Sequence, residues 1–197
     1  METIKGLKRT NYCGELRIED AGKEVTLFGW CQRQRDLGNL IFIDLRDRTG
    51  LVQLSFNDTT DREVFAKAQS VRAEYVVAAV GTVCERESKT NKIATGDIEI
   101  NVKEFRIISK AETPPFEIAK SEKVGDETTL KYRYLNLRNE KLTQNILMRH
   151  KIAKIAREYF YDNDFIEIET PMMIKSTPEG ARDYVVPSRV HNGKFYA

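Results

Sequence analysis

A charged segment near the end of the chain has the residue types to hold a small ligand. Residues 175–183 read KSTPEGARD and combine several charges with a proline and with the flexible Gly180. The carboxylate of Glu179 could hold an ammonium group, and a loop with one stiff and one permissive residue could close over a ligand. A solvated surface connection accounts for the same residues, and periodicity does not choose between these two interpretations.

A second set of candidate residues begins with Phe42. In residues 40–46, alternation places Ile41, Ile43 and Leu45 on one face of a strand and Phe42 on the other. If the aliphatic side chains face a protein interior, Phe42 stands outward, where a single-stranded base could stack on it for about 1–3 kcal/mol. A phenylalanine that covers a neighbouring loop is the alternative interpretation.

Polar side chains are predicted to surround Phe42 on the same face. The same alternation turns Gln53 outward, where its amide can donate and accept at a base edge. Arg33 and Arg35 leave the preceding strand at the same end and can meet phosphates or bases. Glu99 also points out and suits the donor-rich Watson–Crick edge of guanine. Each residue alone is typical of a solvated surface, but their convergence predicts RNA binding.

The elements that must position these residues form a recognisable series. Residues 25–33, 39–46, 51–56, 75–84 and 98–108 are strand-like, and residues 61–72 have helical spacing. That helix presents an apolar face of Val64, Phe65, Ala68 and Val71. Three strands, a helix and two strands are the order of the OB-fold, an all-β barrel whose second and third strands face oligonucleotides. A barrel that binds nothing is the alternative.

The remainder of the chain predicts a second, incomplete unit. Residues 109–129 contain Pro114-Pro115 and look like a connector and hinge. A long amphipathic helix is predicted over residues 140–162, with Asn139 as its cap, followed by a strand at 165–169 that Pro171 stops. A hairpin is predicted around residues 191–194. One helix, one strand and a half hairpin cannot close a core, so we expect a fragment of a larger protein.

Composition narrows the class of protein. The 197 residues include 41% apolar types and carry a net charge of +2, so RNA binding must come from local placement rather than from a polycation. No apolar run approaches the ~18 residues of a membrane span, and a signal region is absent, so we expect a cytoplasmic protein without membrane contact. The three cysteines are far apart and far from both histidines, so we expect no metal site.

Several segments of the chain resemble the bacterial aspartyl-tRNA synthetases of class II. The resemblance rests on YCGELR from residue 12, GWCQRQRDLGNLIFIDLRDRTGLVQ from residue 29, ATGDIEI from residue 94, LKYRYLNLRN from residue 130 and IETPMMIKSTPEGARDYVVPSRVHNGKFYA from residue 168. The barrel segments are similar to lysyl and asparaginyl relatives too, whereas STPEGARDY is more specific to the aspartyl branch. A lysyl or asparaginyl relative, or a noncatalytic tRNA-binding or single-stranded nucleic-acid-binding OB-fold protein, is the alternative.

The resemblance implies a role for each candidate residue. Residues 1–108 would be an OB-fold anticodon-binding domain, 109–139 a hinge, and 140–197 the truncated start of a class II α+β catalytic domain. Phe42 would stack on the central anticodon base and Gln53 would contact it, while Glu99 would read the first base. The resemblance adds four residues to the anticodon-binding set: Arg33, Arg35, Leu37 and Arg86. It implies that Pro171 lies at a dimer interface and that Glu179 binds aspartate. The loop that closes over aspartate would contain Ser176, Thr177, Gly180, Arg182 and Asp183.

The resemblance implies an activity that this chain alone should lack. A full-length relative would use ATP and Mg²⁺ to convert L-aspartate to aspartyl-adenylate and would then charge tRNA(Asp), as a homodimer. The family's second and third motifs, which clamp ATP and bind magnesium, are absent, so no catalytic residue is assigned here and the fragment is expected to be inactive. Relatives that also charge the asparagine tRNA often have His where this chain has Leu37, which implies discrimination between the two tRNAs.

Overall fold

The computed structural model describes residues 2–177 and 182–197. The chain forms two compact units, Met1–Asn139 and Glu140–Ala197.

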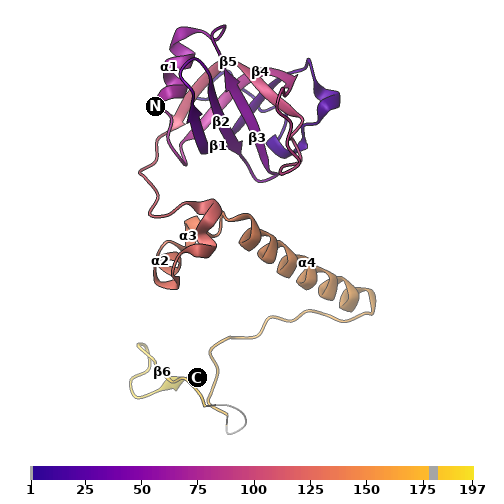
Figure 1. The fold of residues 1–197 in the computed structure, drawn as a ribbon. Helices are drawn as coiled ribbons and strands as arrows, with labels where there is room; N and C mark the ends of the chain where they lie inside the picture. The colour runs from indigo at the N-terminus through magenta and orange to yellow at the C-terminus, as the bar shows by residue number, and fades with distance from the viewer. Residues whose placement is uncertain (1, 178–181) are drawn as a thin grey trace. The chain divides into compact units, whose positions relative to one another are not determined.

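The first unit contains a closed five-stranded barrel (Figure 1). Its strands are β1 (Glu24–Asp36), β2 (Ile41–Arg46), β3 (Leu51–Phe56), β4 (Val76–Glu85) and β5 (Ile98–Ser109), with α1 (Arg62–Ser70) between β3 and β4. The strand order around the barrel is β1-β2-β3-β5-β4, and only the β3–β5 pair is parallel among the barrel's pairs. This arrangement confirms the predicted OB-fold.

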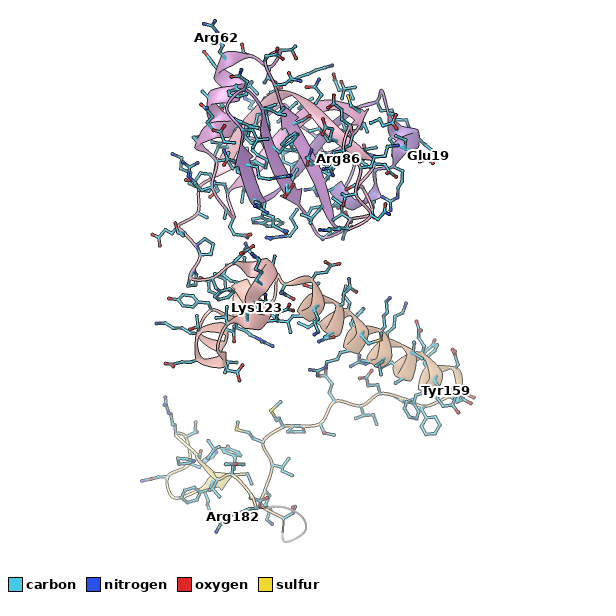
Figure 2. The ribbon with its side chains drawn as sticks, viewed as in Figure 1. Glu19, Arg62, Arg86, Lys123, Tyr159 and Arg182 are labelled. Carbon is cyan, nitrogen blue, oxygen red and sulfur yellow. The ribbon has the colours of Figure 1, made fainter. Side chains whose placement is uncertain are left out.

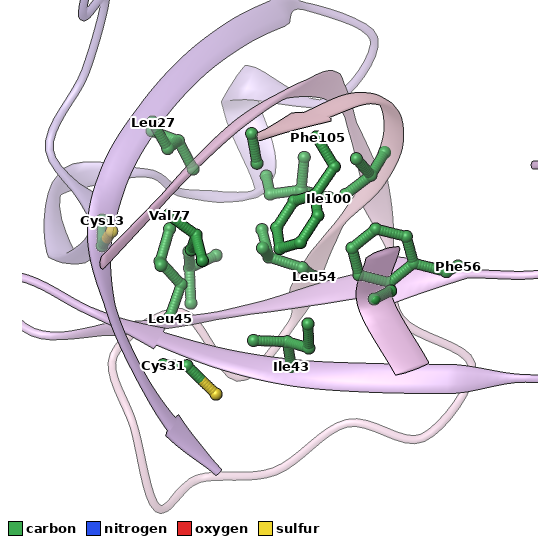
Figure 3. Close-up of a cluster of buried hydrophobic side chains, with 14 of the residues drawn as sticks. Cys13, Leu27, Cys31, Ile43, Leu45, Leu54, Phe56, Val77, Ile100 and Phe105 are labelled. Carbon is green, nitrogen blue, oxygen red and sulfur yellow. The ribbon is translucent and has the colours of Figure 1, made fainter. Parts of the chain in front are cut away.

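The barrel interior is filled by the aliphatic residues that alternation predicted. Ile41, Ile43 and Leu45 of β2 have no solvent exposure, and Leu54 and Phe56 of β3 are equally buried. Figure 3 shows Ile43, Leu45, Leu54 and Phe56 together in this core. The ring of Phe56 meets that of Phe105 edge to face, with the centroids 5.1 Å apart. Because the sheet closes on itself, the described barrel residues leave few unpaired strand edges, and one face of every strand is removed from water.

Strand β1 is longer than predicted because its pairing with β2 continues beyond a bulge to Asp36. Before the bulge, Val25, Leu27 and Cys31 point into the core. The pairing with β2 then shifts between Cys31 and Arg33. One residue is therefore extra, and the alternation of β1 changes phase beyond it. Strand β1 runs on to Asp36, so the predicted end at residue 33 was wrong.

Short elements close the two open ends of the barrel. Helix α1 begins after Asp61, whose carboxylate accepts hydrogen bonds from the N–H groups of Glu63 and Val64. Its buried residue Ala68 belongs to the barrel core. The 3₁₀ helices η1 (Cys13–Glu15) and η2 (Ile18–Asp20) precede β1, and residues 13 and 16 in this N-terminal segment are also part of the core.

Residues 110–139 are more ordered than the connector that the sequence predicted. They form η3 (Ile118–Lys123), α2 (Asp126–Lys131) and α3 (Arg133–Asn136), which enclose a small core of Phe116, Ile118 and Leu135. This segment is also tied to the barrel by a buried carboxylate. Oε2 of Glu74 accepts hydrogen bonds from Arg46 Nη2 at 2.8 Å and Arg138 Nη1 at 2.6 Å.

The second unit consists of one long helix followed by extended chain. Helix α4 spans Glu140–Asp162, as predicted. Its end is a Schellman motif: Asp164 has a φ of 63°, and the N–H of Phe165 reaches the carbonyl of Phe160 at 3.0 Å. The rings of these two phenylalanines pack 5.4 Å apart. Asn163 and Asp164 therefore end the helix where the sequence predicted.

The strand predicted at residues 165–169 is wrong. These residues have no strand assignment and are exposed, because the N–H of Phe165 completes the helix cap and no described segment pairs with the others. The predicted hairpin exists but is short, with β6 (Val186–Pro187) antiparallel to β7 (Phe195–Tyr196). Among residues 2–177 and 182–197, no helix has the length and apolar content to cross a bilayer.

Candidate nucleic-acid interface

The outward side chains of β1, β2, β3 and β5 form a lateral row on the barrel wall. In the strand pairing Arg35 lies opposite Phe42, Asp44 lies opposite Gln53, and Gln53 lies beside Glu99. Residues far apart in sequence are thereby adjacent in space, because each ladder brings one outward side chain next to the next. The predicted convergence of Phe42, Gln53 and Glu99 on one face follows from this register.

Gln53 is the centre of a hydrogen-bond network in this row. Its Oε1 accepts from Arg35 Nη2 at 2.9 Å and from Arg86 Nη2 at 2.8 Å. Its Nε2 donates to Glu99 Oε2 at 2.8 Å. We name Arg35, Phe42, Gln53, Arg86 and Glu99 the Gln53 cluster. Both lone pairs of the amide oxygen are used, so the amide holds two arginines and one glutamate in set directions.

The exposure of Gln53 differs from the expectation for a residue that meets RNA directly. Gln53 points away from the barrel interior, as predicted, but its side chain is only 3% exposed. The arginine and glutamate side chains that bind it also cover it. One amide N–H is left for a ligand, so a contact between Gln53 and a base stays a prediction.

Phe42 keeps an outward orientation in the middle of β2. The aliphatic residues on either side of it are fully buried in the core, whereas Phe42 is half-buried on the opposite face. The Cζ of Arg35 lies 5.3 Å from the ring centroid. Arg35 also donates to Asp44 Oδ1 at 3.0 Å, so its guanidinium is held against the ring from two sides.

Two further predicted residues lie on β1 and its following turn. Arg33 is exposed and faces Asp44 in the strand pairing, because the bulge turns it outward. Leu37 lies in the turn between β1 and β2 and is 68% exposed. The turn is closed by a hydrogen bond from the Leu37 N–H to the carbonyl of Leu40. Neither residue contacts the Gln53 cluster through any interaction that the described part of the chain shows.

Asp44 is the residue of this face that the sequence prediction did not select. It is an acceptor for Arg35, and it stands between Arg33 and Gln53 in the strand pairing. The alternation that turned Phe42 outward had placed Asp44 on the same face, so the signal was present in the sequence. The face therefore carries both arginines and carboxylates, which suits selective contacts to base edges better than non-specific contacts to phosphates.

The second unit brings together only part of the predicted ligand-closing loop. Ser176 Oγ donates to Asp183 Oδ2 at 2.6 Å, so the two ends of the loop are joined. Thr177 and Arg182 are exposed. Glu179 and Gly180 lie outside the described residues, so the predicted contact with an ammonium group stays a prediction.

Pro171 also lies in the second unit, whereas the metal prediction concerned the whole chain. Pro171 is exposed on extended chain and ends no strand ladder within the described residues. Across residues 2–177 and 182–197, no group of three or more His, Cys, Asp or Glu side chains is arranged to hold a metal ion.

Two family models match the chain. Residues 25–108 match the OB-fold nucleic acid binding domain, and residues 125–197 match the class II tRNA synthetases (D, K and N). The first match covers the barrel and the second covers α2, α3 and the second unit.

Curated relatives match the chain over its whole length. The aspartate–tRNA ligase of Ruminiclostridium cellulolyticum is 56% identical over 198 residues, and the aspartate–tRNA(Asp/Asn) ligase of Caldanaerobacter subterraneus subsp. tengcongensis is 55% identical. Each match covers 100% of this chain and 33% of the relative. The chain therefore spans a third of the length of these relatives.

Solved structures of synthetases have the same fold. Asparaginyl-tRNA synthetase from Pyrococcus horikoshii complexed with asparaginyl-adenylate superposes with a TM-score of 0.81 at 26% identity. The superposition covers 96% of this chain and 42% of the synthetase chain. Aspartyl tRNA synthetase from Entamoeba histolytica gives a TM-score of 0.77 at 27% identity over 85% of this chain and 40% of its own. The chain is therefore similar over its whole length to about a third of bacterial aspartate–tRNA ligases, and its residues 125–197 match the class II tRNA synthetases (D, K and N).

Proposed function

We propose that the chain is the tRNA-reading part of an aspartate–tRNA ligase. The whole protein would activate L-aspartate with ATP and transfer it to tRNA(Asp), while the barrel reads the anticodon. The observation that carries the proposal is the Gln53 cluster on one wall of an OB-fold: hydrogen bonds to Gln53 hold two arginines and a glutamate, and one of these arginines lies against the outward ring of Phe42. Relatives at 50–56% identity are named for this activity.

The cluster supports base recognition because its groups differ in chemistry. The ring of Phe42 offers a flat surface on which an unpaired base can stack. Arg35 and Arg86 offer N–H donors to base acceptors, and Glu99 offers acceptors to a base with exocyclic donors. Since Gln53 already fixes these three polar groups, little side-chain freedom remains to be lost when RNA binds. Arg33 and Leu37 would extend the surface along the strand.

The catalytic half of the proposal rests on the second unit. Class II synthetases use ATP and a divalent metal, and these would be bound by the part of the relatives that has no counterpart in this chain. Among the described residues, no group of three or more His, Cys, Asp or Glu side chains is arranged to hold such a metal. Glu179 would hold the ammonium group of aspartate, within a loop whose ends are joined by Ser176 and Asp183. Thr177, Gly180 and Arg182 would complete that loop.

The setting of the whole protein is part of the same proposal. Pro171 would lie at the interface of a homodimer, and the protein would work in the cytoplasm. Helix α4 exposes several large apolar side chains, among them Ile152 and Tyr159. An apolar face of this kind requires a cover in a stable protein, and the remainder of a catalytic domain would supply it.

A second candidate function is a relaxed enzyme that charges both the aspartate and the asparagine tRNA. Several relatives, at 50–55% identity, are named as aspartate–tRNA(Asp/Asn) ligases. We favour discrimination, since Leu37 stands in the turn where such enzymes often have histidine. Charging of both purified tRNAs by the full-length protein decides between the two, because a discriminating enzyme should leave the asparagine tRNA uncharged.

Phe42→Ala tests the anticodon proposal in this 197-residue chain. The variant should weaken binding of an RNA stem-loop with a GUC anticodon by about 5- to 150-fold, which corresponds to the ~1–3 kcal/mol of one stacked base. Fluorescence anisotropy measures the affinity. Tyr161→Ala is a matched control, since that ring is 80% exposed on α4 and should leave the affinity unchanged. An unchanged affinity for Phe42→Ala would contradict the stacking role.

A further inference from the structure

Two arginine side chains converge on the ring of Tyr12, outside the Gln53 cluster. The Cζ of Arg9 lies 4.6 Å from the ring centroid, and the Cζ of Arg48 lies 4.4 Å from it. Arg9 also lies 5.5 Å from the ring of Phe28 and donates from Nη2 to that residue's carbonyl at 3.1 Å. The N-terminal segment, β1 and the β2–β3 turn thus bring two positive charges to one place.

Neither of these two guanidinium groups has an ion-pair partner among the described residues. Arg35 and Arg46, in contrast, each pair with an acidic side chain. Asp47 lies in the same turn as Arg48, but its two oxygens accept from the backbone N–H of Cys13 and from Thr49. Like charges held close together repel each other. The pair is therefore complementary to an anion.

The site is also built before any ligand arrives. The N–H of Gly14 donates to Thr49 Oγ1 at 2.8 Å, and a side chain at position 14 would collide with the carbonyl of Thr49. Burial would raise the pKa of Asp47, but its hydrogen bonds from Cys13 and Thr49 outweigh burial and hold the pKa below its usual value. The segment that carries Tyr12 is therefore locked to the turn that carries Arg48.

We propose that Arg9, Tyr12 and Arg48 form a second RNA-binding site on the barrel, which takes a backbone phosphate. Guanidinium groups bind phosphate oxygens with two parallel hydrogen bonds. Arg48 follows Asp44, which lies opposite Gln53 in the strand pairing, by four residues. Four residues of extended chain span at most about 13 Å, so one RNA strand can reach both the Gln53 cluster and Arg48. The inference rests on the proposed function and adds a contact that is independent of the base sequence.

The test uses the 197-residue chain and two fluorescent RNA stem-loops, one with a GUC anticodon and one with a changed anticodon. Affinities are measured by anisotropy over a range of KCl concentrations for Arg9→Gln, Arg48→Gln and the double variant. Each lost phosphate contact should weaken binding several-fold at low salt and reduce the slope of log affinity against log salt by about 0.7–0.9. The loss should be the same for both RNAs.

Three further variants complete the design. Arg48→Lys keeps the charge and should keep most of the salt slope. Arg62→Gln removes the same charge from the start of α1, where the side chain projects into solvent (Figure 2), and should change neither affinity nor slope. Phe42→Ala should weaken binding of the GUC stem-loop and leave the slope unchanged. Fluorescence of Trp30, the single tryptophan, verifies that each variant is folded.

The outcomes separate the second site from the anticodon proposal. The second site alone is overturned if Arg9→Gln and Arg48→Gln leave the slope of log affinity against log salt unchanged while Phe42→Ala still weakens binding of the GUC stem-loop. A loss confined to the GUC stem-loop also overturns it, because a phosphate contact does not depend on the base. A parent chain that binds neither RNA at low salt overturns both proposals. If the double variant unfolds, Arg48→Gln alone decides, since the exposed Arg48 side chain shows no hydrogen bond within the described chain.

Discussion

The barrel strands and helix α4 each carry apolar residues on one face, with a period of two in the strands and 3.6 in the helix, yet only the barrel has a core. Every strand of the barrel buries one face, and residues such as Leu45 and Leu54 are fully enclosed. None of the residues of α4 is buried, and Ile152 and Ile155 are 60% and 64% exposed. A closed sheet covers its own apolar face, whereas a single helix needs another element to cover it.

Ion pairs are also buried in the first unit and exposed in the second. Glu74 is 6% exposed and accepts from two arginines in the first unit. Glu167 in the second unit pairs with Arg157 at 3.2 Å, but both side chains are more than 60% exposed. Water competes for the second pair and is excluded from the first. Burial, rather than the number of charged pairs, should therefore decide which carboxylates matter for stability.

The largest effect is expected for Glu74→Ala. Removing one partner of a buried ion pair leaves an uncompensated charge, so the free energy of unfolding of the first unit should fall by about 3–5 kcal/mol. Glu167→Ala is the matched variant and should cost about 0–1 kcal/mol. Urea unfolding followed by Trp30 fluorescence reports on the first unit, and far-UV circular dichroism reports on α4. Equal effects of the two variants would contradict the comparison.

Glu74→Gly separates the effect of the lost carboxylate on stability from the effect of the backbone conformation at residue 74. Glu74 has a φ of 64°, a region that L-residues reach at a cost of about 1–2 kcal/mol and that glycine reaches freely. The glycine variant should therefore be about 1 kcal/mol more stable than Glu74→Ala, although both lack the carboxylate. The same urea titration gives the difference. An alanine variant as stable as the glycine variant would show that the backbone here is unstrained.

A core substitution should give the next largest contrast. Leu54→Ala opens a cavity in the closed barrel and should lower the free energy of unfolding by about 2–5 kcal/mol. Ile152→Ala removes a similar volume from a side chain that is 60% exposed. Because alanine is also the better helix former, that variant should leave the helical signal of α4 unchanged or slightly stronger. A large loss of helix there would mean that something already covers this face.

A smaller contrast than that of the core substitutions concerns two aspartates that accept from a hydroxyl group. Asp47 is half-buried and also accepts from the N–H of Cys13 at 2.7 Å, so Asp47→Ala should cost about 1–3 kcal/mol by leaving that donor unsatisfied. Asp183 is exposed beside Ser176, and Asp183→Ala should cost about 0.5 kcal/mol or less. Urea unfolding at neutral pH measures the first cost, and circular dichroism of the second unit measures the other.

The effect of Asp47 should depend on pH in a defined direction. Its pKa is lower in the folded chain than the ordinary value, so the unfolded state binds the proton first. The stabilisation is therefore complete above the ordinary aspartate pKa near 4 and declines as pH falls below it. The difference in stability between the parent chain and Asp47→Ala should shrink on acidification. A difference that grows at low pH would contradict the assignment.

Periodicity predicted the elements whose partners lie within the same ladder or the same turn. The order of strands and helices along the chain, including α4, followed from local periodicity. The burial of Ile41 and Ile43 followed too, because one face of each strand must leave water. The helix end at Asn163 followed in the same way, since its cap is formed by adjacent residues. The strand predicted at 165–169 failed because a strand exists only with a partner, and no described residue supplies one.

The sequence by itself determined which side chains of β2 face the core and that Phe42 opposes them, because a period of two leaves no other choice on a strand with one buried face. The sequence also placed Arg35 at this end of the barrel, but only the tertiary structure decided that its guanidinium lies against the Phe42 ring. The odd-numbered residues of β1 point inward up to Cys31 and outward from Arg33, since the bulge adds a residue that no local pattern reveals. Likewise, only the pairing of β3 with β5 made Gln53 the buried centre of the cluster.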